Sequence, residues 1–145
     1  MKYPLLIICV FLLIGCGFNP RAAFDRLGFT EDSFLHGRII DQNGQAEWQS
    51  LSKEDIRAIV TEMKRIRPAR TAVVEPRFRI ALFTDSSEET PNLQIFLDTT
   101  GEGYFRTAPG REIMFYSRHA ESTMEAITTN PEPEGAGLPP LRGVP

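Results

Sequence analysis

The sequence predicts an α+β fold, in which one main amphipathic helix packs on an antiparallel β-sheet that forms a meander. Three observations favour this fold: apolar residues recur at helical spacing over 53–67, they alternate with polar residues over 78–82 and 93–97, and a Pro-Gly turn separates two further short strands. The chain has 145 residues, of which 41% are hydrophobic and 24% are charged. This length and composition are typical of one small globular domain with short appendages.

The first predicted element is a short helix near the N-terminus. Asn19 can cap it, Pro20 suits its first turn, and Gly28 suits the position after its last turn. A helix of about two turns is marginal on its own. We therefore expect residues 16–32 to form a tether in front of a single domain that spans 33–129.

A β-hairpin is expected next. Ile39 and Ile40 precede the polar segment 42–45, which contains Asn43-Gly44, and Trp48 follows it. An Asn-Gly pair tolerates the positive φ values of a tight turn. The pattern thus predicts a strand over 38–41 and a returning strand over 46–48.

The clearest element is a helix from Lys53 to Arg67. Ser52 and Asp55 have the spacing of a capping box, with Asp in place of the more usual Glu. Proline cannot continue a helix, so Pro68 should end it. The apolar stripe that should pack on the sheet consists of Ile56, Ile59, Val60, Met63 and Ile66.

The remaining elements continue the meander and close the domain. Alternating apolar and polar residues predict strands with one buried face, and Pro109-Gly110 suits a type II turn between the last two. The expected elements are strands over 78–82, 93–97, 103–107 and 112–117, followed by a short helix over 120–128.

The last 16 residues, 130–145, contain five Pro and three Gly. Such a composition cannot bury a core, so we expect a disordered tail. One alternative function is therefore structural, with this tail reaching toward peptidoglycan or a neighbouring protein.

The N-terminus has the pattern of an export signal. Ten consecutive apolar residues, Leu5 to Ile14, follow the basic Lys2. A membrane-spanning helix needs about 20 apolar residues, whereas a run of about 7–15 after a positive charge is typical of a secretory signal.

Leu13-Ile14-Gly15-Cys16, at the end of this run, resembles the lipobox of bacterial lipoproteins. The resemblance implies that residues 1–15 are a signal peptide, that Cys16 becomes the first residue and carries a diacylglyceryl group, and that its new amino group is acylated, commonly with palmitate. Such a protein is attached to the membrane outside the cytoplasm. In Gram-negative families an Asp after the lipidated Cys retains the protein in the inner membrane, and Gly17 in that place favours the outer membrane.

Several classes of chemistry are not expected. The net charge of −3 and the pI of about 5.4 argue against nucleic-acid binding, which needs clustered positive charge. Cys9 lies in the signal and Cys16 is the lipid site, so no thiol remains for a disulfide or a metal. His36 and His119 lie in no metal-binding pattern, and no cofactor motif occurs. We therefore expect no metal, no cofactor and no catalytic residues.

The alternation of the strands also predicts a surface. If Phe78, Ile80 and Leu82 face the helix, the opposite face of the sheet is rich in arginine and aromatic residues, which are typical of interfaces. The candidate partner surface comprises Arg77, Arg79, Phe83, Gln94 and Phe96.

Two alternatives bear on this surface and on function. The tether helix or the Trp48 hairpin would hide the surface if either packed over it. We expect a non-enzymatic binding module for an envelope protein or cell-wall component. The alternative is a small envelope hydrolase whose Ser, His and carboxylate groups meet only in three dimensions.

Overall fold

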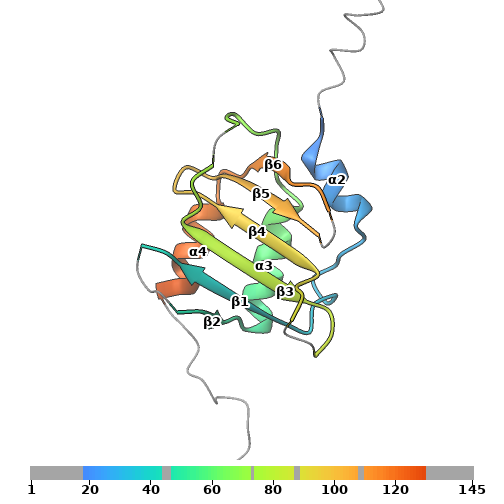
Figure 1. Cartoon of the computed structure of the whole chain (residues 1–145), viewed down its shortest axis with the longest axis vertical. Helices are drawn as coiled ribbons and strands as arrows, with labels where there is room; N and C mark the ends of the chain where they lie inside the picture. Colours follow the sequence, from blue (N-terminus) through green and yellow to red (C-terminus); the bar gives the residue numbers. More distant parts are fainter. Residues whose placement is uncertain (1–17, 44–46, 73, 87–88, 108–109, 130–145) are drawn as a thin grey trace, which may run out of the picture.

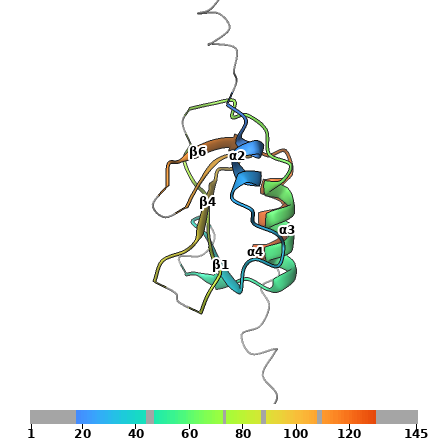
Figure 2. The ribbon, with the colours of Figure 1, turned by 90° about the vertical axis from the view of Figure 1, so that its right-hand side faces the viewer.

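A six-stranded antiparallel sheet carries its helices on one face, as Figures 1 and 2 show from two sides. The structure is a computed structural model that describes residues 18–43, 47–72, 74–86, 89–107 and 110–129. The predicted signal peptide, Cys16 and the predicted tail over 130–145 lie outside the described residues. The predicted α+β fold is confirmed.

The strands follow the order β2-β1-β3-β4-β5-β6, so four of them form the predicted meander and the N-terminal pair joins it through β1. The elements are α2 (Pro20–Arg26), β1 (His36–Asp41), β2 (Gln49–Ser50), α3 (Lys53–Met63), β3 (Phe78–Phe83), β4 (Leu93–Leu97), β5 (Glu102–Arg106), β6 (Ile113–Tyr116) and α4 (Ala120–Thr129).

The core lies between the sheet and the helices. One registered row of the sheet crosses five strands and contributes only apolar side chains to it: Ile39, Ile80, Ile95, Phe105 and Ile113. Phe78, Ile80 and Leu82 all belong to this core, as the alternation predicted. Because successive side chains of a strand point to opposite faces, the residues between these core positions lie on the other face of the sheet.

Helix α3 begins as predicted and ends earlier. Ser52 Oγ accepts from the Asp55 N–H, and an Asp55 carboxylate oxygen accepts from the Ser52 N–H, both at 3.0 Å. The helix stops at Met63 because the backbone of Arg67 pairs with Tyr116 of β6 instead, with N–O distances of 2.8 and 2.9 Å.

The expectation that residues 16–32 are only a tether is wrong for the described part. Phe24 of α2 is 1% exposed, and its ring meets the Phe105 ring edge-on at 5.6 Å. Glu31 forms an ion pair with Lys64, the C-cap of α3, and Asp32 forms one with Arg57 of α3. A short helix that is marginal alone is thus held by its burial in the core of the domain.

The predicted hairpin also has a different register. Strand β1 pairs through Arg38 and Ile39 with Ser50 and Gln49, so the returning strand is β2 and not 46–48. The strand β1 ends where Asp41 turns to accept the Asn43 N–H at 3.0 Å. Part of the predicted turn, 44–46, lies outside the described residues.

Candidate binding surface

The face of the sheet opposite the core carries no described helix, and we call it the open face (Figure 2). Helix α2 does not cover it, because α2 packs into the core, whereas Trp48 lies against Arg38 at the β1 edge of this face. The open face comprises His36, Arg38, Ile40, Arg79, Ala81, Phe83, Gln94, Phe96, Glu102, Tyr104, Arg106, Met114 and Tyr116.

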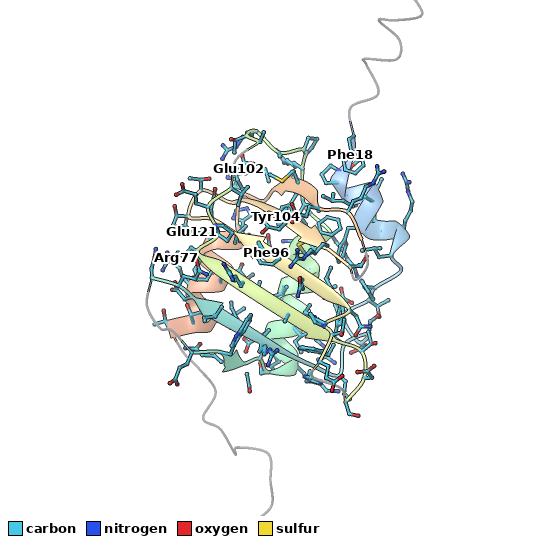
Figure 3. All side chains as sticks on the ribbon, in the orientation of Figure 1. Phe18, Arg77, Phe96, Glu102, Tyr104 and Glu121 are labelled. Carbon is cyan, nitrogen blue, oxygen red and sulfur yellow. The ribbon has the colours of Figure 1, made fainter. Side chains whose placement is uncertain are left out.

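The centre of the open face is an aromatic pair flanked by guanidinium groups. The Phe96 and Tyr104 rings stack at a centroid distance of 4.5 Å and an angle of 14° (Figure 3). The guanidinium carbons of Arg79 and Arg106 lie 5.9 and 5.2 Å from the Phe96 ring centre. Gln94 Oε1 accepts from Arg106 Nε at 2.6 Å, which fixes that guanidinium beside the pair.

A second cluster lies at the β1 side of the same face. The Arg38 guanidinium carbon lies 5.1 Å from the Trp48 ring centre and 5.4 Å from that of Phe83. The His36 imidazole stacks on Phe83 at 4.6 Å. The buried atoms Arg38 Nε and His36 Nε2 have no hydrogen-bond partner among the described residues. Aromatic rings therefore hold Arg38 where a carboxylate usually would.

Four of the five residues singled out from the sequence lie on the open face. Arg79, Gln94 and Phe96 are there with part of their surface accessible. Phe83 is on this face as well, but it is fully buried beneath its two neighbours from β1. It can therefore support the surface without touching a partner directly.

Arg77 lies elsewhere, at the end of the sheet beside α4 (Figure 3). Its guanidinium donates twice to the Asp41 carboxylate, each at 3.1 Å, and once to Glu125 at 2.9 Å, and Glu121 is 3.9 Å away. The hydrogen bond to Asp41 and the negative charges around it raise the pKa of Arg77. Arg77 fastens α4 to the sheet and is not available as a partner contact.

A similar pair lies at the same end of the strands, on the β5 side of the open face. The buried Glu102 carboxylate accepts from Arg70 Nε at 2.7 Å and from the Arg70 backbone N–H at 3.1 and 3.2 Å. The Arg70 guanidinium carbon lies 3.6 Å from the Tyr116 ring centre. The hydrogen bond to Glu102 raises the pKa of Arg70. This corner of the face is thus neutralised within the protein.

Sequence reasoning missed the contributions of β1 and β5 to the surface. Arg38, Tyr104 and Arg106 alternate with Ile39, Gly103 and Phe105, which face the core. For β5, the alternation of core-facing and open-face residues could have been recognised in the sequence. For β1, the pairing with β3 decides that Arg38 and Arg79 share a face, and no local pattern signals it.

The described residues offer no support for the hydrolase alternative. Ser117 donates its hydroxyl to Glu62 Oε2 at 3.2 Å inside the core. His36 stacks on Phe83, while His119 is exposed next to α4 on the other side of the sheet. The cavity beside Ser117 and Glu62 has a volume of about 10 Å³, which leaves no room for a substrate.

Within the described part of the chain, no group of three or more His, Cys, Asp or Glu side chains could hold a metal ion. None of the described helices has the length and apolar character needed to cross a bilayer. In the comparisons with known proteins, no family model, no curated protein and no solved structure matches this chain.

Proposed function

We propose that this chain is a bacterial envelope lipoprotein, anchored through lipid on Cys16, whose domain is a non-enzymatic binding module for another envelope component. The observation that carries the binding part is the open face. It presents Arg79, Arg106, Phe96 and Tyr104 side by side, without a helix over them. Arginine and aromatic residues are enriched at interface cores and hot spots.

The anchoring part is supported by the lipobox resemblance and by the position of α2. The last residue before the described part is Gly17, and Phe18 is 63% exposed just ahead of α2. An extended chain covers at most about 3.6 Å per residue, so a lipid on Cys16 would hold α2 within about 15 Å of the membrane. One acyl chain gives marginal anchoring, and two or three make it stable.

Intact mass spectrometry and membrane fractionation test the anchor. We expect the mature chain to begin at Cys16, to carry a diacylglyceryl group and to sediment with membranes. Cys16→Ser should abolish all three, whereas Cys9→Ser, which changes the other cysteine of the N-terminal segment, should leave them intact. An unlipidated wild-type chain would refute the anchor.

Site-specific photo-crosslinking in cells tests the open face. We would replace Phe96 with p-benzoylphenylalanine and, as a matched control, do the same at Arg57, which is half exposed on α3 behind the sheet. We expect a discrete crosslinked product from the Phe96 position alone. The binding proposal fails if the Phe96 position gives no product, or if Arg57 gives the same one.

A further inference from the structure

We propose that the occupant of the open face is a segment of another polypeptide that carries carboxylates about 14 Å apart; this rests on the proposed function and names the chemistry of its partner. The inference comes from three arginines of the open face, Arg38, Arg79 and Arg106, and from their spacing. Together they make this face positive in a chain whose net charge is −3.

The protein itself leaves these guanidinium groups largely unneutralised. Within the described residues, Arg38 and Arg79 form no ion pair with a carboxylate, and Arg106 has only Glu112 at 3.6 Å, with both side chains about half exposed. An exposed pair of this kind contributes little. Arg70 and Arg77, by contrast, each meet a buried carboxylate. These three arginines therefore lack the buried carboxylate that pairs with Arg70 and with Arg77.

The guanidinium groups of Arg38 and Arg106 are also held in place. The Trp48 and Phe83 rings both contact the Arg38 guanidinium, Gln94 holds Arg106 Nε, and the Phe96 ring lies beside Arg106. A planar guanidinium that is already ordered loses less entropy when a carboxylate binds its remaining N–H groups in pairs. The site is thus preorganised for carboxylates.

The spacing of Arg38 and Arg106 matches that of side chains in an extended peptide. The strand register places Arg38, Ala81, Gln94 and Arg106 in one row directly across four strands. Three strand spacings of about 4.8 Å separate the two arginines by about 14 Å. In an extended peptide, side chains four positions apart point the same way and lie about 14 Å apart. Two acidic residues at this spacing can reach both guanidinium groups at once.

The surface around these arginines indicates the class of partner. The next row across the sheet runs through Ile40, Arg79, Phe96, Tyr104 and Met114, so apolar surface lies alongside the charged row. The open face contains arginine, aromatic residues and methionine and no lysine. That composition is typical of the core of a protein–protein interface. It favours a peptide with apolar and acidic side chains over a lipid headgroup.

A fluorescence titration tests the proposal, because Trp48 is the only tryptophan in the chain and contacts Arg38. The full chain would be kept in non-ionic detergent and titrated with a β-prone peptide of Thr and Val that has two glutamates four positions apart. One control peptide has glutamine in both places, and the other has the two glutamates adjacent.

We expect the spaced-glutamate peptide to bind at least about tenfold more tightly than either control peptide. Arg38→Gln and Arg106→Gln should each reduce its affinity by about tenfold, and Arg57→Gln, on the far side of the sheet, should leave it unchanged. The comparison of peptides on the wild-type chain requires no variant to fold.

Equal binding of the glutamate and glutamine peptides would overturn the proposal, and equal binding of the two glutamate peptides would overturn the spacing. If vesicles with phosphatidylglycerol change the Trp48 emission in an Arg38-dependent way and the peptides do not, the occupant is a membrane surface instead. A crosslinked product at Phe96 together with failure of all peptides would reject this inference while leaving the proposed function standing.

Discussion

At the scale of single residues, the arginines of this protein divide by what they contact. Arg77 and Arg70 meet the buried carboxylates of Asp41 and Glu102, whereas Arg38 and Arg79 lie against aromatic rings. Arg77 and Arg79 occur in the same alternating stretch, so the sequence placed them together. In the tertiary structure they are separated. Arg77 lies just before β3, between Asp41 and α4, whereas Arg79 lies within β3 on the open face.

Arg77→Gln should lower the free energy of unfolding by about 2–4 kcal/mol, because it leaves the Asp41 carboxylate buried without its charge partner. Urea denaturation measures the loss. Arg57→Gln removes an exposed pair with Asp32 and should cost less than about 1 kcal/mol. Similar losses in the two variants would contradict the role given to Arg77.

At the scale of elements, the sequence correctly predicts an end of a helix or strand when residues close to it in the chain determine that end. The Ser52–Asp55 capping box was readable because both partners lie within one helical turn. The end of α3 was not readable, since Arg67 pairs with Tyr116, far along the chain. The same holds for β2, whose register depends on the pairing across the loop and not on the Asn-Gly signal.

The contact between Glu31 and Lys64 ties the segment after α2 to α3, and it should make stability depend on pH. The hydrogen bond and charge of Lys64 lower the pKa of Glu31. A carboxylate with a lowered pKa stabilises the fold above its ordinary pKa of about 4.3 and loses that contribution as the pH falls through the folded value.

Lys64→Met should therefore lower the urea midpoint slightly at about pH 7 and have less effect once the pH falls below the lowered pKa of Glu31, where Glu31 is protonated in both states. The effect should be small because both side chains are more than one third exposed. A difference from wild type that grows as the pH falls would contradict this linkage.

At the scale of the whole molecule, the structure resolves two questions that periodicity leaves open. The strand period predicted two faces of the sheet, and the burial of Ile80 and Ile95 shows which of them meets the helices. The packing of α2 was not predictable, because seven residues with one buried aromatic ring resemble a linker in sequence. The open face is left bare because α2, α3 and α4 all lie on the other side (Figure 2).

Phe24→Ala should cost about 3–5 kcal/mol, since it empties a fully buried site between α2 and Phe105. Thermal or urea unfolding measures this loss. Phe18→Ala, at a position that is 63% exposed, should change stability by no more than about 0.5 kcal/mol. Equal stability of the two variants would mean that α2 is a tether after all.

The most direct test of a domain with one core face and one binding face compares Ile95→Ser with Phe96→Ser, at neighbouring residues of β4 that point to opposite sides. We predict that Ile95→Ser lowers the free energy of unfolding by about 4 kcal/mol or more, because it leaves a cavity and a buried hydroxyl. Phe96→Ser should lower the free energy of unfolding by only about 1 kcal/mol. With p-benzoylphenylalanine in place of Tyr104, Phe96→Ser should also abolish the crosslinked product. A folded Phe96→Ser chain that still gives the crosslinked product from the Tyr104 position would contradict the assignment of the open face as the binding surface.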